Sequence, residues 1–181
     1  SPGPQVGKLV PKIRSTALIL YAIYAGMTVV QFVLMICGGM PLFDAITIAI
    51  GTAGTGGFAV TNAGLGGYSY YIQTVVAVFM ILFGVNFNVY YLFLIKKPKQ
   101  ALKSEEVRWY FGIIAVAVIL ITWNTRGMYS SLYDSAHHAF FQVATLISST
   151  GFATTDFNLW PTLSKTILLL IMFCGACAGS T

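Results

Sequence analysis

Apolar stretches long enough to cross a bilayer alternate along this chain with short polar or glycine-rich stretches. Residues 16–37, 70–95 and 107–123 are almost wholly apolar, and a further apolar run starts at Thr166 and continues past Cys177. At 1.5 Å of rise per residue, a helix over the first run covers roughly 30 to 35 Å, the thickness of a bilayer core. The pattern predicts an all-α membrane protein.

Two apolar runs, residues 42–53 and 134–147, are too short to cross a bilayer and predict re-entrant helices. Each leads into a glycine-rich stretch, GTAGTGGFAVTN at 51–62 and TLISSTGFATTD at 145–156. Irregular backbone at membrane depth is tolerated only where it is buried in protein or lines a watery path. Two such loops in one chain therefore indicate a pore.

Composition and charge agree with this interpretation. The chain is 57% hydrophobic and 8% charged, with a mean hydropathy of +0.79, which excludes an ordinary soluble domain. A net charge of +5 would suggest a nucleic-acid partner in a soluble protein, but here the basic residues flank apolar runs. Positive-inside sorting explains them, so no nucleic-acid partner is predicted. The basic stretch 96–106 either docks a cytosolic partner or only sets the topology, and topology is the preferred interpretation.

The chain also contains an internal repeat. The order of long apolar run, short helix, glycine loop and long apolar run occurs twice, which fixes the architecture. We divide the chain into a cytoplasmic lead-in (1–14), a pore repeat (15–95), a cytoplasmic linker (96–106) and a following pore repeat (107–181) that ends inside its last helix. A shift of 94 residues superposes Ala45, Gly57, Phe58, Ala59 and Thr61 on Ala139, Gly151, Phe152, Ala153 and Thr155.

The loop sequences resemble a known family. TGGF at 55–58 and STGF at 149–152 are similar to the filter loops of the Trk/Ktr/HKT superfamily of potassium transporters, most closely the bacterial Trk/Ktr membrane subunit. KLVPKIRSTALIL at 8–20 and GACAGST at 175–181 resemble the same family. Four helix, pore-helix, helix repeats surround one pore in that family. The resemblance implies that this chain holds the second repeat and most of the third, as an internal fragment of a longer polypeptide.

A filter of this kind replaces the hydration shell of K⁺ with backbone carbonyls. Pointing successive carbonyls at one axis needs backbone angles that glycine permits, a role we assign to Gly57 and Gly151. Phe58 and Phe152 are expected to pack behind the loops. Because Ala59 and Ala153 replace the second glycine of the channel pattern, fewer ion sites are expected, and the preference for K⁺ over Na⁺ is left open. The expected ion-binding residues are Thr55, Gly56, Gly57, Phe58, Ser149, Thr150, Gly151 and Phe152.

The resemblance further implies potassium uptake across the bacterial plasma (inner) membrane by a multi-pass protein, with K⁺ as the transported ion and no organic cofactor. It implies a homodimer in contact with membrane lipid, a cytosolic nucleotide-binding regulatory ring, and the missing repeats of the same polypeptide as partners. In that family the last helix of this stretch is interrupted below the filter and acts as a gate. We expect a gate that lies mostly beyond the chain, with contributions from Gly175, Gly179, Ser180 and Thr181.

Two alternatives stay open at this point. One is a two-pore-loop cation channel completed by dimerisation, and the other is an intramembrane enzyme that uses the pair Cys174 and Cys177 or the pair His137 and His138. The cysteines lie on an apolar run with no histidine nearby, which favours small core residues. Adjacent histidines on a helix are expected to face different ways, which favours interfacial or pore-helix residues. No paired carboxylates, HExxH or GxSxG motif is present, so no enzyme is predicted.

Two aspartates stand near the starts of the short helices. Asp44 is expected in the first turn of its helix, where a carboxylate complements the helix dipole. Asp134 or Ser135 is expected to cap the second short helix. An alternative interpretation is that both carboxylates attract cations to the outer entrance of the pore. Helix capping is the preferred interpretation.

Overall fold

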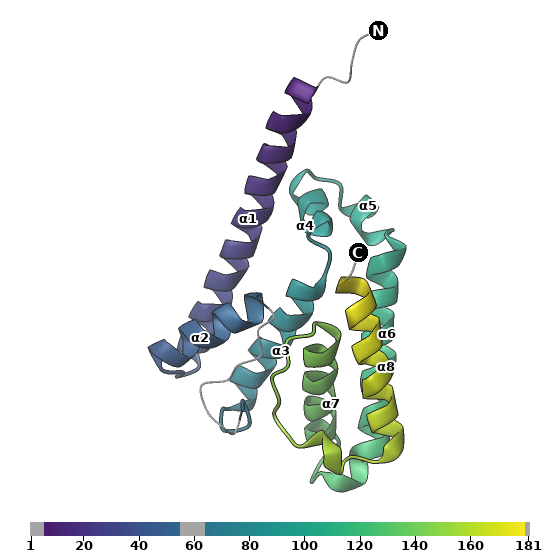
Figure 1. Ribbon diagram of the computed structural model, residues 1–181. Helices are drawn as coiled ribbons and strands as arrows, with labels where there is room; N and C mark the ends of the chain where they lie inside the picture. Colours follow the sequence, from purple (N-terminus) through teal and green to yellow (C-terminus); the bar gives the residue numbers. More distant parts are fainter. Residues whose placement is uncertain (1–5, 55–63, 180–181) are drawn as a thin grey trace.

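The computed structural model describes residues 6–54 and 64–179, and it describes the side chains of residues 13–54 and 64–176. No strand occurs in these ranges, which confirms the all-α prediction. The helices are α1 (Val6–Cys37), α2 (Leu42–Ala53), α3 (Tyr70–Gly84), α4 (Phe87–Leu94), α5 (Pro98–Leu102), α6 (Glu105–Thr125), α7 (Leu132–Ile147) and α8 (Thr162–Gly179), with 3₁₀ turns η1 (Arg126–Met128) and η2 (Phe157–Leu159) (Figure 1).

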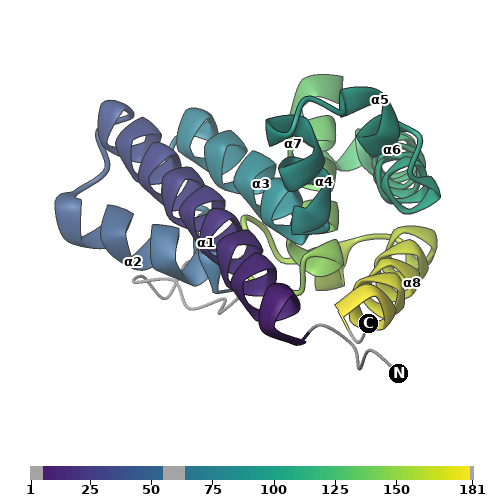
Figure 2. The same ribbon diagram turned by 90° about the horizontal axis from the view of Figure 1, so that it is seen from above.

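The helices form two groups of similar design. Each has a long helix, a short helix that packs against it, and a returning helix: α1, α2 and α3 in one group, and α6, α7 and α8 in the other. Figure 2 shows the groups side by side, and the contact of α3 with α7 joins them. Ala45 and Ala139, which the repeat superposes, are both fully buried at equivalent positions of α2 and α7.

Two of the described helices are long and apolar enough to cross a membrane, over residues 13–37 and 105–128, and the bent pair α3 and α4 adds a third when counted as one span. The first helix starts at Val6, ten residues before the predicted start at residue 16, so most of the predicted lead-in is helical. The short apolar helix α2 has the predicted bounds 42–53. Helix α7 begins two residues earlier than predicted, at Leu132.

The apolar run 70–95, predicted as one span, is not one continuous helix but is divided into α3 and α4. The axes of α3 and α4 meet at 86°, with the break at Val85 and Asn86. Val85 has an extended backbone (φ −73°, ψ 143°), and the side chain of Asn86 accepts the N–H of Asn88 at 3.0 Å. Asparagine at this position starts a new helix because its side chain satisfies a free N–H group. Periodicity alone does not reveal the bend, since the residues on both sides are apolar.

Two tyrosine hydroxyls donate hydrogen bonds to backbone carbonyl groups at the end of α3. The hydroxyl of Tyr110 donates to the carbonyl of Ile81 at 2.8 Å, and the hydroxyl of Tyr90 donates to the carbonyl of Leu82. A broken helix inside a membrane needs such partners, because lipid cannot satisfy free carbonyl groups. Side chains of α4 and α6 therefore stabilise the bend by binding the end of α3.

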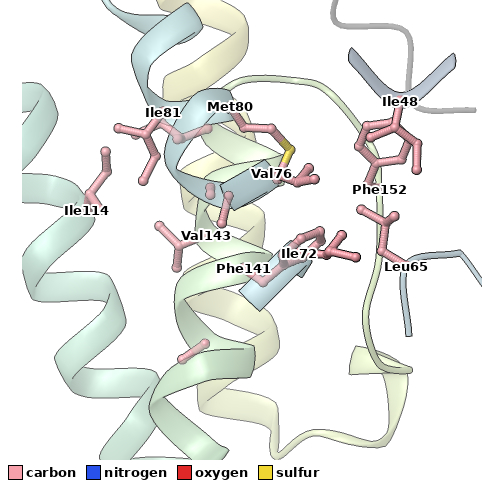
Figure 3. Close-up of a cluster of buried hydrophobic side chains, with 14 of the residues drawn as sticks. Ile48, Leu65, Ile72, Val76, Met80, Ile81, Ile114, Phe141, Val143 and Phe152 are labelled. Atoms are coloured by element: carbon pink, nitrogen blue, oxygen red, sulfur yellow. The ribbon is translucent and has the colours of Figure 1, made fainter. Parts of the chain in front are cut away.

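One buried core connects the two groups. Ile72, Val76 and Met80 of α3 lie against Phe141 and Val143 of α7 (Figure 3). Among the described residues, Phe141 and Phe152 are the largest fully buried side chains. Because the core crosses from one repeat to the other and includes Phe152, the position of the second loop depends on both repeats.

Candidate ion-filter site

The two predicted filter loops differ in how much of them the structure describes. Thr55, Gly56, Gly57 and Phe58 lie outside the described residues. Ser149, Thr150, Gly151 and Phe152 are described and follow the end of α7. The geometry of the site is therefore that of the second loop and of its neighbours.

The second loop begins with a left-handed turn that ends α7. The N–H of Thr150 donates to the carbonyl of Thr145 at 2.9 Å, and the N–H of Ser149 donates to the carbonyl of Leu146 at 3.2 Å. This pair of bonds is the Schellman motif, in which the residue after the cap is left-handed and is usually glycine. Here that residue is Ser149, with φ of 58°. The turn stops the helix and directs the chain into the loop.

Side chains at the end of α7 hold the next residues. The hydroxyl of Thr145 accepts the N–H of Gly151 at 2.9 Å, and the hydroxyls of Ser148 and Thr150 lie 2.7 Å apart. Gly151 has φ of 91°, a conformation that glycine adopts at little cost and that a Cβ disfavours. The backbone of Gly151 therefore has the kind of conformation for which glycine is expected at this position.

The carbonyl groups of this turn are available to a ligand. Within the described ranges, the carbonyl oxygens of Ser149, Thr150 and Gly151 accept no hydrogen bond. Ser149 and Gly151 are exposed, whereas Thr150 and Phe152 are 3% and 2% exposed. Backbone carbonyls at membrane depth need a partner, and rings of such carbonyls coordinate dehydrated cations in channels. The arrangement can supply oxygen ligands to a cation.

Phe152 anchors the loop to the first repeat. Its ring lies between Ile48 of α2 and Leu65, which follows the first loop (Figure 3). The N–H of Leu65 donates to the carbonyl of Ala153 at 2.9 Å. A Cβ on Gly64 would lie 2.7 Å from the same carbonyl oxygen, so the two backbones approach closely. The second loop therefore packs directly against the segment that leaves the first.

Sequence reasoning missed Gln73, which braces this contact. It lies on α3 and is 2% exposed. Its Nε2 donates to the carbonyls of Leu65 at 2.9 Å and Tyr68 at 3.0 Å, and its Oε1 lies 2.6 Å from Nε2 of His137 on α7. One buried amide thus joins the end of the first loop to the second short helix. The signal was available, since a polar residue within an apolar span usually has a specific partner.

Two further buried glutamines stand beside the loops. Nε2 of Gln31 on α1 donates to the hydroxyl of Thr52 near the end of α2 at 3.0 Å, and Nε2 of Gln142 donates to the carbonyl of Thr155 at 3.5 Å. Oε1 of Gln31 is buried and has no hydrogen-bond partner among the residues that the structure describes. A glutamine amide therefore binds the end of α2, and another binds the outer part of the second loop.

The histidine pair lies in the second turn of α7 and contacts Tyr70. The ring of His137 stacks on Tyr70 with centroids 3.8 Å apart, and Nε2 of His138 lies 3.2 Å from the Tyr70 hydroxyl. The planes of the two rings meet at 81°, and apart from Tyr70 their hydrogen-bond partners differ: Gln73 for His137 and Thr154 for His138. Both histidines lie on the short helix α7. Nδ1 of His138 lies 3.0 Å from the hydroxyl of Thr154, so it also reaches the outer leg of the loop.

Burial controls the protonation of this pair. It lowers the pKa of His137 to about 4, with a smaller contribution from His138. It also lowers the pKa of His138, while the nearby carboxylate of Asp134 opposes that shift. Both rings are therefore neutral near pH 7. No group of three or more His, Cys, Asp or Glu side chains that could hold a metal ion is present in the described ranges.

The aspartates occupy the first turns of the short helices. Asp44 is in the first turn of α2, as predicted, and accepts the hydroxyl of Tyr68 at 2.7 Å. The prediction that Asp134 or Ser135 caps α7 is wrong, because Ser131 is the cap and accepts the N–H of Asp134 at 3.1 Å. Serine is an equally good cap, and the helix extends back to it.

The predicted gate residues are described only in part. Helix α8 continues without a break through Gly175 to Gly179, and Ser180 and Thr181 lie outside the described residues. A Cβ on Gly175 would lie 2.5 Å from the carbonyl oxygen of Ile147, at the end of α7. Gly175 thus allows α8 to pack against the base of the loop. Cys174 is exposed, and the side chain of Cys177 is not among those described.

The chain has two units of the same design, each with a long helix, a short helix, a connecting loop and a returning helix. Together with the long apolar helices, this arrangement defines an all-helical integral membrane protein. Residues 4–181 match the TrkH family, described as a cation transport protein, and the chain belongs to that family. The family is one of transporters and not of enzymes.

Individual relatives agree with the family. The chain is 35% identical to the Trk system potassium uptake protein TrkG of Escherichia coli (strain K12) and 34% identical to the Trk system potassium uptake protein TrkH of Salmonella typhimurium. Each match covers 99% of this chain and 38% of the relative. The crystal structure of the potassium transporter TrkH from Vibrio parahaemolyticus superposes with a TM-score of 0.82 at 30% identity, over 89% of this chain and 36% of that one. The chain thus spans less than two fifths of these relatives.

Proposed function

We propose that this chain supplies two filter loops of a protein that takes up K⁺ across the bacterial plasma membrane. The observation that carries the proposal is the turn at Ser149, Thr150 and Gly151. Its carbonyls have no donor within the described residues, and two of its residues have left-handed backbone angles. Relatives named as potassium uptake proteins support K⁺ as the ion.

In this proposal the second loop contributes carbonyls from Ser149 to Gly151, while Phe152 holds the loop from behind. By the internal repeat, Thr55 to Phe58 contribute in the same way. The glycine positions allow successive carbonyls to face one axis, where they replace the water that K⁺ loses. The two outer aspartates, Asp44 and Asp134, add negative charge near the entrance and raise the local cation concentration.

The proposed gate lies on the cytoplasmic side of the filter. Gly175 sets the distance between α8 and the base of the second loop, so a displacement of α8 there is transmitted to the loop. Gly179, Ser180 and Thr181 are proposed to continue this region. The likeness to the Trk/Ktr transporters supports a homodimer, completion of the pore by further repeats of the same polypeptide, and control by a cytosolic nucleotide-binding ring.

Uptake of radiolabelled Rb⁺ by bacteria that lack their own potassium uptake systems tests the proposal. Cells that express the full-length protein should accumulate Rb⁺, and excess K⁺ should suppress the accumulation more strongly than excess Na⁺. Cells that express the protein with Gly151→Ser serve as the comparison. Absence of Rb⁺ uptake by well-expressed, correctly inserted protein would contradict the proposed function.

A further inference from the structure

The segment between the two repeats presents apolar and basic side chains together. Helix α4 leaves α3 at 86°, so it crosses the direction of the preceding helix instead of continuing it (Figure 1). We call residues 93–103 the linker elbow. Its exposed apolar side chains are Phe93, Leu94, Ile95 and Leu102, and its exposed basic side chains are Lys96, Lys97, Lys99 and Lys103. Short helical segments with one apolar and one basic side are typical of chain that lies in the membrane interface.

Lys96 has a conformation that lysine rarely adopts. Its φ is 61°, and it occupies the position after the cap of α4. The N–H of Lys97 donates to the carbonyl of Leu92 at 2.9 Å, and the N–H of Lys96 donates to that of Phe93 at 3.2 Å. In this motif glycine is the favoured residue. Left-handed backbone angles cost free energy at a residue other than glycine. The presence of lysine at this position therefore points to a function of its side chain.

Three of these lysines line an open hollow on the surface. Lys96, Lys97, Pro98, Lys99 and Gln100 line a volume of about 450 Å³. Pro98 is the first residue of α5 and fixes the backbone between the second and third of these lysines. No carboxylate lies within 4.0 Å of their ammonium groups in the described part of the chain. Three lysines without a carboxylate partner among the described residues therefore line one hollow.

We propose that Lys96, Lys97 and Lys99 bind the headgroup phosphate of an anionic phospholipid in the cytoplasmic leaflet, while Phe93 and Leu94 contact its acyl chains. Setting the topology would need only the number of basic residues, not a hollow or a left-handed lysine. An acidic protein surface would complement the charge but not the adjoining exposed apolar side chains. The cytoplasmic leaflet carries anionic lipids that attract such basic segments. The inference is independent of the transported ion.

Native mass spectrometry of the purified full-length protein, titrated with phosphatidylglycerol and separately with phosphatidylcholine, tests the proposal. The Kd of the first phosphatidylglycerol should rise about fivefold for each lysine replaced, since a lysine near an anionic surface contributes about 1 kcal/mol. Lys96→Gly removes the positive charge without destabilising the fold, because glycine suits the left-handed position. This variant should bind phosphatidylglycerol more weakly while its melting temperature stays equal or rises. Lys165→Gln, an exposed lysine at the other end of the molecule, is the matched control and should change neither value.

Two results would overturn the proposal. The first is an unchanged Kd for phosphatidylglycerol when Lys96, Lys97 and Lys99 are all replaced by Gln in folded protein. The second is complete displacement of the lipid by equimolar inorganic phosphate, which would indicate a site for a soluble anion.

Discussion

The backbone N–H of Leu65 donates to the carbonyl of Ala153 at 2.9 Å, which joins the segment after the first loop to the second loop. The two residues are 88 positions apart, and each belongs to a different repeat. Phe152 and Gln73 reinforce the contact, the first by packing against Leu65 and the second by binding its carbonyl. The second loop is therefore not positioned by its own repeat alone, so changes in the first repeat should affect it.

Replacing Gln73 with Leu should destabilise the protein. The substitution leaves the carbonyls of Leu65 and Tyr68 and the ring of His137 without their present partner, and each unsatisfied buried group costs roughly 1–3 kcal/mol. We expect a melting temperature several degrees lower in detergent, measured by loss of the monodisperse peak after heating. Gln100→Leu changes an exposed glutamine and should have little effect. Equal stability of the two variants would show that the brace is unimportant.

Gly175→Ala should weaken the packing of α8 on α7. The added Cβ would lie 2.5 Å from the carbonyl oxygen of Ile147, too close for any real contact, so the helices must separate. We expect a loss of about 1–3 kcal/mol, the range for overpacked interiors. Gly112→Ala is the control, because a Cβ there meets nothing within 4 Å and alanine favours the helix. A stability measurement that ranks Gly175→Ala at or above the control would refute the close approach.

At position 149 a substitution is expected to stabilise the protein, because serine is strained by the left-handed backbone angles there. With φ of 58° at the end of α7, Ser149→Gly should stabilise the protein by up to about 1 kcal/mol, while Ser149→Val should destabilise it. Melting temperatures of the two variants and the parent form the comparison. If valine is tolerated as well as glycine, the turn does not have the left-handed backbone described above.

The buried histidine predicts a dependence of stability on pH. The pKa of His137 is lowered from 6.5 to about 4, so the folded state holds the neutral ring while the unfolded state binds a proton. The contribution is complete above pH 6.5 and is lost as pH falls from 6.5 towards 4. Melting temperatures across this range should decline less steeply for His137→Gln than for the parent. Parallel curves would exclude His137 as the source.

The sequence predicts the features that depend on hydrophobicity and glycine. Apolar run lengths locate the long and short helices, and the glycines mark the loop whose Gly151 proves to have a left-handed backbone. It does not reveal the bend at Val85 and Asn86, because an apolar pattern is the same on a straight and on a broken helix. Gln73 was missed because its partners are 64 residues away or in a loop, and only packing brings them together.

The most direct test of the proposed filter is the competition of Na⁺ with radiolabelled Rb⁺ uptake in bacteria without their own potassium uptake systems. The full-length protein is compared with its Gly57→Ser, Gly151→Ser and Gly112→Ser variants, the last having open space around the glycine and serving as the matched control. Inserted, monodisperse Gly57→Ser and Gly151→Ser proteins should discriminate Rb⁺ from Na⁺ less well than the parent, and Gly112→Ser should equal the parent. Unchanged discrimination in both loop variants would mean that these loops are not the filter.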